Sequence, residues 1–252
     1  MWETLHASMR HWYRLIGAGS EGARTLERDG VVAALVPASL QRSVVNSVVY
    51  EHPAALADAY DEVAAAYDEI GAKWTVWVHT GDTETAALLE SRGHVLDASP
   101  EAMAADLAAA PPRRPPEDAL DDWTADGDMA DVGAINDRAY GHGGDWFSRA
   151  LTEVPSGALH VYVARSGGEA VGCCAIADTG ANSEVQMVAV VPEARGNGIS
   201  RKLIAHALAD AVDRGAGTST LVATKLGRPV YERLGYRPLG ALEMWERRLD
   251  ER

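Results

Sequence analysis

The sequence predicts an α/β protein made of two copies of one fold, each a sheet flanked by helices. The first observation is a repeat, because segments 86–94 (AALLESRGH) and 228–236 (RPVYERLGY) both combine a short helical pattern with a closing glycine. The two closing glycines, Gly93 and Gly235, are 142 positions apart. The second observation is that an apolar strand candidate precedes a proline and a long helical pattern in each half. A repeat of this length indicates a duplicated unit.

In the first half, the strand candidate is the segment 43–50 (SVVNSVVY), and the helix after it starts at Pro53. Apolar residues at helical spacing indicate this helix. They are Leu56, Tyr60, Val63, Tyr67 and Ile70. The segment 73–78 (KWTVWV) then predicts a buried strand, whose Trp74 and Trp77 either pack in this half or line a pocket between the halves.

A proline-rich segment separates the two halves. Four prolines within 111–116 (PPRRPP) forbid a helix or a central strand there. We therefore expect a first domain at 1–110, a linker at 111–117 and a second domain at 118–252.

In the second half, the segment 184–191 predicts a strand that leads through a glycine-rich segment into a helix. The helix is indicated by a stripe of apolar residues, namely Ile199, Leu203, Ile204, Ala207, Leu208, Ala211 and Val212. The first half enters its helix directly from Pro53 without a glycine. The glycine-rich segment therefore distinguishes the two copies.

The segment 195–200 (RGNGIS) has the features of an anion site. Glycines between a strand and a helix allow the backbone to curl so that consecutive N–H groups point at one spot. The first helical turn adds unpaired donors and the positive end of the helix dipole, which suits a pyrophosphate. Arg195, Arg201 and Lys202 add positive charge in a chain whose formal net charge is −14. A purely structural helix start is the alternative.

This strand and loop resemble the acetyl-CoA signature of the GNAT acyltransferase superfamily. In that family a strand ending in a Val-x-Pro-like sequence leads into Arg/Gln-x-x-Gly-x-Gly/Ala, matched here by segment 190–192 (VVP) and then Arg195, Gly198 and Ser200. Ser200 replaces the usual glycine or alanine. The segment 226–236 is similar to the family's last helix and Gly-aromatic turn, so the resemblance extends over residues from about 118 to 249.

The resemblance implies two tandem GNAT-type domains, each a mixed, mostly antiparallel sheet flanked by helices, as in the tandem bacterial acyltransferases. It implies a helix at 128–140 and strands at 161–165 and 170–177. It also implies that the first copy, which lacks the glycine loop, binds no CoA and serves as a scaffold or as one wall of the acceptor site.

The resemblance further implies that acetyl-CoA binds as a co-substrate and that no metal is required. The backbone of 188–190 is expected to hold the pantetheine arm and the thioester carbonyl, and 195–200 the pyrophosphate. The expected cofactor-binding residues are Val188, Ala189, Val190, Arg195, Gly196, Asn197, Gly198, Ile199, Ser200 and Arg201. An asparagine that many relatives have after the next strand is missing here, and Thr224 or Lys225 is the candidate to replace it.

Two residues are the candidates for acid and base chemistry. Tyr231 matches the tyrosine that protonates the departing CoA thiolate in many relatives, and the equivalent residue of the first half is Leu89, so packing alone does not demand a phenol. Glu184 matches a glutamate that removes a proton from the amine in several relatives, although an ordered water is the alternative base. Direct transfer to the amine leaves no acyl group on Cys173 or Cys174.

A glycine-rich segment at 140–146 borders the acceptor site in the family, so Tyr140, Asp145 and Trp146 are expected to contact the substrate. We therefore expect an acetyl-CoA-dependent N-acetyltransferase that acts on a small-molecule or peptide amine. A non-catalytic acyl-CoA-binding regulator is the rival interpretation, and a protein without any CoA site is the third. The acceptor and the oligomeric state do not follow from the sequence.

Composition excludes several other classes of protein. A net charge of −14 argues against binding to nucleic acid or to an anionic membrane, because both require a basic face. The longest mostly apolar stretch, 31–40, is too short to span a membrane, and the N-terminus lacks a secretory signal pattern, so we expect a cytoplasmic protein. The adjacent Cys173 and Cys174 form neither a disulfide framework nor a spaced metal site, and we expect them to be buried in a strand.

Overall fold

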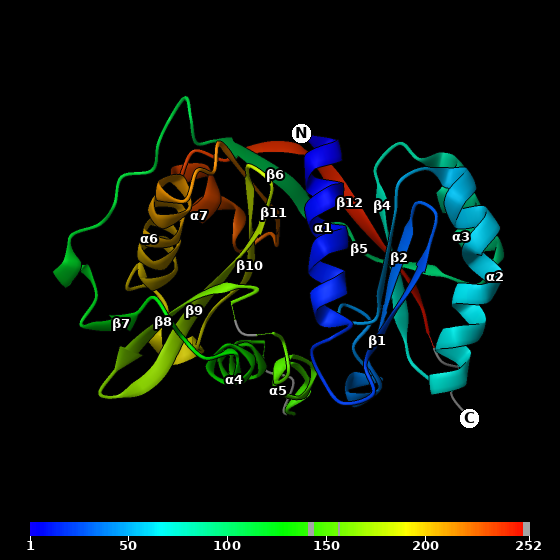
Figure 1. The fold of residues 1–252 in the computed structure, drawn as a ribbon, viewed down its shortest axis with the longest axis horizontal. Helices are drawn as coiled ribbons and strands as arrows, with labels where there is room; N and C mark the ends of the chain where they lie inside the picture. The colour runs from blue at the N-terminus through cyan, green and yellow to red at the C-terminus, as the bar shows by residue number, and fades with distance from the viewer. Residues whose placement is uncertain (141–143, 156, 249–252) are drawn as a thin grey trace.

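A single sheet runs through both halves of the molecule. The computed structural model describes residues 1–140, 144–155 and 157–248 (Figure 1). Over these residues, twelve strands follow the order β1-β2-β3-β4-β12-β6-β11-β10-β9-β8-β7, with β5 paired to β12. The pair β3·β4 and the pair β10·β11 are parallel, and the other described pairs are antiparallel. The expected mixed, mostly antiparallel sheet is confirmed.

The elements of the two halves have the following bounds. The first half contains α1 (Trp2–Ile16), β1 (Arg24–Arg28), β2 (Val31–Leu35), β3 (Ser47–Tyr50), α2 (Pro53–Ile70), β4 (Trp74–His79), α3 (Thr83–Ser91), β5 (Val95–Ala98) and β6 (Glu101–Asp106). The second contains β7 (Asp122–Thr124), α4 (Met129–Ala139), α5 (Trp146–Leu151), β8 (His160–Ser166), β9 (Glu169–Thr179), β10 (Asn182–Val190), α6 (Ile199–Asp213), β11 (Thr218–Ala223), α7 (Arg228–Arg233) and β12 (Arg237–Arg247).

The predicted repeat is present as a repeated order of elements. A strand, a long helix, a parallel strand and a short helix follow one another as β3, α2, β4, α3 and again as β10, α6, β11, α7. One predicted bound is wrong, because the first strand of this unit begins at Ser47 and not at residue 43. Residues 43–46 belong to a turn that Asn46 holds, since its side chain accepts from the amide of Val36 (2.7 Å) and donates to the carbonyl of Ser39 (3.0 Å).

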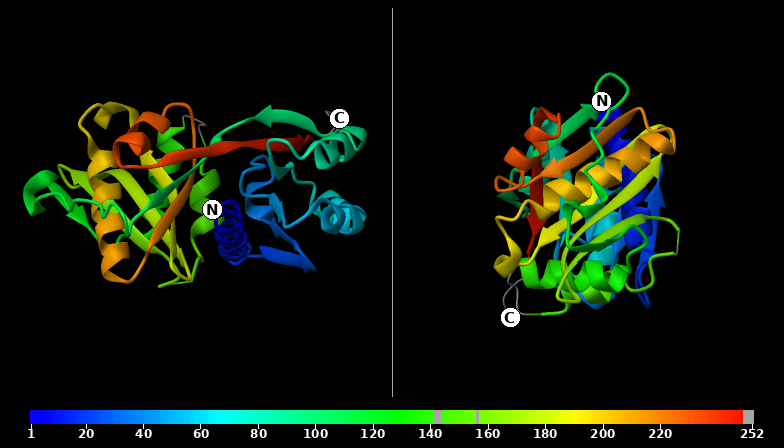
Figure 2. Two further views of the ribbon diagram at one scale, coloured as in Figure 1. Left: turned by 90° about the horizontal axis from the view of Figure 1, so that it is seen from above. Right: turned by 90° about the vertical axis from the view of Figure 1, so that its left-hand side faces the viewer.

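The last strands of the two halves are exchanged. β6 comes from the first half, yet it pairs with β11 and with the first part of β12 in the second half. The remainder of β12, Leu242 to Arg247, extends into the first half and pairs with β4. Figure 2 shows β12, in red, running along the long axis from the second half into the first. Each half therefore completes its sheet with a strand from the other.

Strands that lie before the proline-rich linker pair with strands that lie after it. Residues 111–116 form neither helix nor strand, and Arg114 binds Asp210 and Asp213 of α6 (2.7 Å to Asp213). The division into 1–110 and 118–252 stays a prediction. The exchanged strands β6 and β12 each pair with strands on the other side of this division.

Helix α1 lies between the two halves and shares its core with both (Figure 1). Its apolar face packs against β2 and β3 of the first half and against β9 and β10 of the second. The residues of this face are Leu5, Met9, Trp12, Tyr13 and Ile16, all at most 5% exposed. Helices α4 and α5 join the same core, whereas α2 and α6 cover the opposite face of the sheet, each over its own half. The buried surface of α1 thus holds the halves together.

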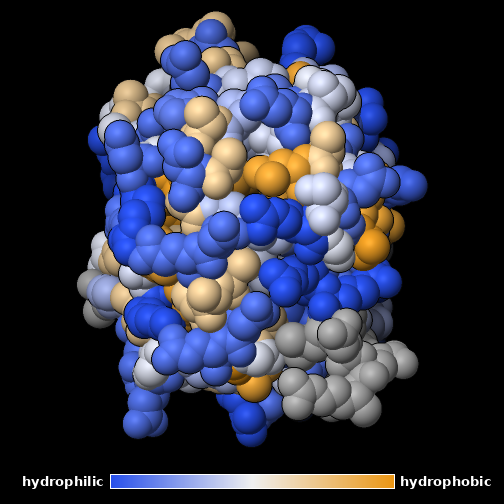
Figure 3. All heavy atoms as spheres, turned by 90° about the vertical axis from the view of Figure 1, so that its right-hand side faces the viewer, coloured by the Kyte–Doolittle hydropathy of each residue, from blue (hydrophilic) through white to orange (hydrophobic). Residues whose placement is uncertain are grey.

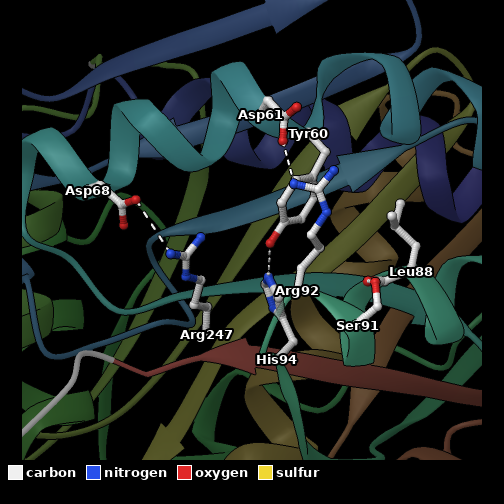
Figure 4. A network of polar contacts seen from close by, with 8 residues as sticks. All are labelled: Tyr60, Asp61, Asp68, Leu88, Ser91, Arg92, His94 and Arg247. Carbon is white, nitrogen blue, oxygen red and sulfur yellow. Dashed lines mark hydrogen bonds and ion pairs between the residues drawn. The ribbon is translucent and has the colours of Figure 1, made fainter.

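The first half also has a separate core beneath α2. Trp74 stacks on Tyr67 with ring centroids 4.8 Å apart, and His94 meets the edge of Trp74 at 4.6 Å. Figure 4 shows the ring of His94 directed at the hydroxyl of Tyr60, 2.9 Å away. The outer surface of this half is mainly hydrophilic, with apolar side chains in small separate groups (Figure 3). Trp74 is thus a core residue of the first half, whereas Trp77 belongs to the core shared by the halves.

Candidate active site

The candidate site begins where two parallel strands separate. β10 pairs with β11 only over three residues, Asn182 to Glu184, opposite Thr218 to Thr220. β10 then continues to Val190 with β9 on one side only. The segment 188–190 therefore has one backbone edge that no described strand pairs. This edge is where the pantetheine arm was predicted, and it has the unpaired backbone groups that such an arm requires.

A bulge in β10 shapes this opening. The pairing with β9 shifts between Gln186 and Ala189, and Met187 has φ of +51°, a left-handed conformation that is rare for a residue other than glycine. The carbonyl of Met187 accepts from Cys173 Sγ (3.1 Å) and Asn136 Nδ2 (3.4 Å). Such local strain persists only where the surroundings hold it, and it is concentrated at functional sites.

The glycine segment forms the start of α6 as the sequence predicts. Gly196 and Gly198 have φ of +85° and +71°, which turn the chain from the short helical turn at Pro192–Ala194 into the helix. The first helical bond runs from the amide of Lys202 to the carbonyl of Gly198 (3.1 Å). The amides of 199–201 precede that bond and have no acceptor within the helix. No side chain caps this end of α6. These donors suit a phosphate group.

The charged side chains at this loop have different surroundings. Arg195 donates to the carbonyls of Val190 (3.1 Å) and Ala139 (2.6 Å), so its guanidinium ties the loop to β10 and to the end of α4. Arg201 is exposed and Lys202 half-buried beside the loop. Asn197 donates to the carbonyl of Ala194 (3.2 Å), which fixes the turn. Of the three predicted cations, Arg195 is therefore the one whose guanidinium is hydrogen-bonded to backbone carbonyl groups.

A hollow of about 370 Å³ adjoins the same loop. Asn197, Ile199 and Lys202 line it from the loop side, and Leu120 and Asp121 line it from the end of the linker. It lies beside the start of α6 and away from Glu184. The candidates to replace the missing asparagine lie farther along the chain, where the Thr224 hydroxyl accepts from the amide of Gly227 (3.2 Å) and Lys225 is exposed.

Glu184 lies at the last residue at which β10 and β11 pair. It is 0% exposed, and neither carboxyl oxygen has a hydrogen-bond partner among the described residues. Burial raises the pKa of Glu184 to about 8, and the nearby amide of Gln186 opposes this shift only in part. A buried carboxyl group without partners is costly for stability and is characteristic of a functional site.

Helix α1 of the first half covers Glu184. Asn182, two residues earlier on the same face of β10, donates to Ser8 of α1 and to Thr220 of β11 (both 2.8 Å). Glu184 contributes to raising the pKa of Tyr13, whose hydroxyl accepts from Trp77 Nε1 (2.8 Å). Sequence reasoning missed Ser8, Asn182 and Tyr13, because no local pattern relates helix α1 to strand β10. The buried tyrosine and serine on the apolar face of α1 were the available signal.

Tyr231 lies on α7, on the other side of the opening. Its side chain is buried at 8% exposure and meets Tyr236 edge-on with ring centroids 5.9 Å apart. Burial raises the pKa of Tyr231, and the electrostatic influence of Cys174 and Tyr140 adds to that shift. The hydroxyl of Tyr231 makes no hydrogen bond within the described part of the chain. The structure shows no direct contact between Tyr231 and Glu184.

The predicted acceptor residues occupy the region around α5. Tyr140 ends α4 near Cys173 and Arg195 and is 46% exposed. Asp145 is bound by Arg149 (2.8 Å) at the surface, so its carboxylate stabilises the start of α5. Trp146 packs against Arg42 of the first half. Residues 141–143, between these positions, lie outside the described part of the chain.

The corresponding region of the first half is built differently. β3 and β4 pair only at Ser47 and Val48, but Tyr50 then donates to Asp82 (2.5 Å), which connects the end of β3 to the start of α3. Helix α2 begins at Pro53 without a glycine turn, and the side chain of His52 caps it. No anion loop is present at this place. That the first half binds no CoA stays a prediction.

Comparison with known proteins decides the family. The profile of the acetyltransferase (GNAT) domain matches residues 157–238. An uncharacterized N-acetyltransferase of Chlorobaculum tepidum is 30% identical over 114 residues, which are 44% of this chain and 72% of that protein. This chain belongs to the GNAT N-acetyltransferase family. Membership supports acyltransferase chemistry with acetyl-CoA as the family's usual acyl donor.

GNAT structures also resemble the whole chain in fold. A GCN5-related N-acetyltransferase from Kribbella flavida has a TM-score of 0.66 at 17% identity, and the match covers 95% of both chains. A tandem GNAT protein from the clavulanic acid biosynthesis pathway has a TM-score of 0.56 at 15% identity and covers 95% of this chain and 94% of that one. At these identities the likeness concerns the fold alone. The tandem GNAT architecture expected from the sequence is therefore confirmed.

The sequence also led to expectations about the two cysteines, a metal site and membrane-spanning helices. Both cysteines are buried and unpaired in β9, as expected. Within residues 1–140, 144–155 and 157–248, no group of three or more His, Cys, Asp or Glu side chains is placed to hold a metal ion. In the same part of the GNAT chain, no helix has the length and apolar character needed to cross a membrane.

Proposed function

We propose that this GNAT protein transfers an acetyl group from acetyl-CoA directly to a primary amine, with Glu184 as the general base and Tyr231 as the general acid. The observation that carries the proposal is the buried, unpartnered carboxyl group of Glu184 at the point where β10 and β11 separate. Amine acetylation needs a base because a protonated amine has no lone pair for attack.

The pKa of Glu184 suits this role. The value of about 8 lies close to neutral pH. At such a pH part of the carboxyl population is ionised, and the carboxylate is basic enough to bind a proton. Glu184 would accept a proton from the ammonium group of the acceptor, and the freed nitrogen lone pair would then attack the thioester carbonyl carbon. As the carbon–sulfur bond breaks, Tyr231 would donate its proton to the departing thiolate, and the second proton that the nitrogen loses as it becomes an amide would restore the Tyr231 phenol. Burial raises the pKa of Tyr231, so this phenol is protonated at neutral pH, as an acid must be.

The cofactor assignment is supported by the backbone of the opening and the loop. Acetyl-CoA supplies the activated acetyl group when bound. The free edge of 188–190 would hold the pantetheine arm, and the amides of 199–201 would bind the pyrophosphate. Gly196 and Gly198 would leave the backbone accessible, since neither carries a side chain over these amides.

The test compares the wild type with Glu184→Gln in the presence of acetyl-CoA and a panel of primary amines. The rate of acetyl transfer is measured as the rate at which free CoA thiol appears. We expect kcat to fall by about 10²- to 10⁴-fold with the Kd for acetyl-CoA unchanged. In the wild type, kcat/KM should rise with pH and level off above about pH 8, because Glu184 must lose its proton to act. In the variant the levelling near pH 8 should disappear, and the remaining increase of kcat/KM should follow the deprotonation of the free amine.

Glu21→Gln, which removes an exposed carboxylate, is the matched control and should behave as the wild type. An unchanged kcat in Glu184→Gln would exclude Glu184 as the base. Binding of acetyl-CoA without turnover of any amine would instead favour the non-catalytic acyl-CoA-binding alternative.

A further inference from the structure

Arg42 is an arginine without an ion-pair partner among the residues that the structure describes. Thirteen arginines of the described chain form ion pairs with carboxylates. Six described arginines do not, and five of these are exposed, namely Arg113, Arg195, Arg201, Arg233 and Arg237. Arg42 is half-buried, and its buried Nε has no hydrogen-bond partner among the described residues. An unpaired guanidinium is unexpected in a chain with net charge −14.

A second orphaned donor lies beside it. The guanidinium carbon of Arg42 is 5.5 Å from the ring centroid of Trp146, and Trp146 Nε1 is also buried without a partner. Gly144 packs closely on the indole, because a Cβ at that position would come within 2.4 Å of Nε1. Two neighbouring buried donors for which the described residues supply no acceptor point to an acceptor that belongs to a ligand.

The position of Arg42 is fixed by the first half of the chain. Its carbonyl accepts from the amides of Val45 and Asn46 (both 3.3 Å), and the fully buried Asn46 also holds the turn that contains Arg42. The guanidinium stacks on the indole of the second half, so the contact joins the two copies. Stacking on an aromatic ring leaves the planar edge of a guanidinium available for a carboxylate.

This pair of donors lies on the side of the sheet that α1 covers. Val44, two residues after Arg42, accepts a hydrogen bond from Tyr13 of α1 (3.2 Å), and α1 also packs on β10, the strand that carries Glu184. Trp146 begins α5, which packs against the 37–39 turn of the first half. A ligand that contacts Arg42 is therefore on the side of the sheet that Glu184 faces.

We propose that the acceptor is an amino acid, whose carboxylate binds Arg42 and Trp146 Nε1 while its amine is directed toward Glu184. The inference rests on the proposed function and adds the class of acceptor to it. The guanidinium edge suits a bidentate carboxylate, and the indole N–H supplies a further donor. Arg42 is thus a specificity-determining residue contributed by the copy that lacks the glycine loop.

The test compares amino acids with the amines that differ from them only by loss of the carboxylate, such as phenylalanine with phenethylamine and leucine with 3-methylbutylamine. Arg42→Gln should lower kcat/KM for the amino acids by about 10- to 100-fold and leave the decarboxylated amines within about twofold. Arg42→Lys keeps the positive charge but not the planar pair of donors, so its kcat/KM for the amino acids should lie between those of the wild type and Arg42→Gln. Arg113→Gln, which removes an exposed unpaired arginine, is the control.

A purely structural role for Arg42 would affect both members of each pair equally, and that result, or no effect on either, would overturn the proposal. Acetyl-CoA titration of Arg42→Gln should match that of the wild type. If the wild type acetylates neither member, the proposed function fails for these acceptors, and calorimetric titration of N-acetylphenylalanine and N-acetylphenethylamine into the CoA-loaded protein tests the carboxylate site alone. Binding of the former that requires Arg42 would support the site, and equal or absent binding would overturn it.

Discussion

Individual residues of the candidate site gain their chemistry from burial. Glu184 is a strand residue of ordinary type, and its raised pKa results from complete desolvation beneath α1. Tyr231 is likewise held protonated by its surroundings on α7. Sequence reasoning identified both residues through a resemblance, but it could not predict their environments, since the helix that covers Glu184 lies more than about 160 residues earlier in the chain.

Replacement of Tyr231 by phenylalanine separates the acid role from packing. We expect kcat to fall by about 10- to 100-fold because the leaving thiolate loses its proton donor, while the Kd for acetyl-CoA stays within about twofold. Tyr236→Phe is the matched control, since it removes the hydroxyl that bonds Ser219 (2.6 Å) in the same cluster. It should cost stability and spare kcat. Equal losses of kcat in the two variants would show that Tyr231 only packs.

His94 predicts how stability depends on pH. Its Nδ1 bonds the carbonyl of Trp245 (3.0 Å) and therefore carries the proton, so its Nε2 accepts from Tyr60. Burial and the charge of Arg247 lower the pKa of His94 from 6.5 to about 4, although the bond to Trp245 opposes the shift. Between these values the unfolded chain binds more protons than the folded one, so stability falls as the pH falls from about 6.5 to 4.

We expect this residue to contribute a slope of about 1.4 kcal/mol per pH unit to the free energy of unfolding in that range. Urea denaturation of the wild type and of His94→Gln at pH 7, 6 and 5 measures it, because groups common to both proteins cancel in the difference. The gap between the two proteins should narrow as the pH falls. A constant gap would show that His94 does not stay neutral in the folded protein.

At the scale of elements, local signals and long-range contacts account for different parts of the fold. The bounds of α2 and α6 and the glycine start of α6 follow from apolar spacing and from Gly196 and Gly198, both of which are local features. The turn at 43–46 was misread as strand because the buried Asn46 overrides the apolar pattern around it. The position of α1 against β10 could not be predicted, because helical periodicity identifies an apolar face but not its partner.

At the scale of the whole molecule, the exchange of β6 and β12 makes the two copies depend on each other. A sequence repeat shows that a unit is duplicated, but each copy offers the same strand pattern, so the pattern does not decide which copy a strand joins. The exchange and the shared core around α1 mean that neither half completes its sheet alone. The first copy therefore contributes α1, which covers Glu184, and the segment that carries Arg42.

This interdependence predicts a single cooperative unfolding transition. Tryptophan fluorescence sums the signals of all seven tryptophans, which lie in both halves, and far-ultraviolet circular dichroism also reports on both halves. In urea, the two signals should change with one midpoint, because loss of either half removes a strand from the other. Two separated transitions would contradict the exchange. A variant truncated after Ala241, which removes the part of β12 paired with β4, should lower the midpoint of the whole protein.

We propose that the second copy of this GNAT protein binds acetyl-CoA at the start of α6, and this binding is measured by calorimetric titration of acetyl-CoA into the protein. The wild type should bind one acetyl-CoA per chain, and Gly198→Trp should lose binding, because φ of +71° is strained for any residue with a side chain and the indole would cover the amides of 199–201. Gly180→Trp, at another turn with positive φ and away from the loop, is the control for a general loss of folding. No binding by the wild type, or full binding by Gly198→Trp, would show that acetyl-CoA does not bind at the start of α6.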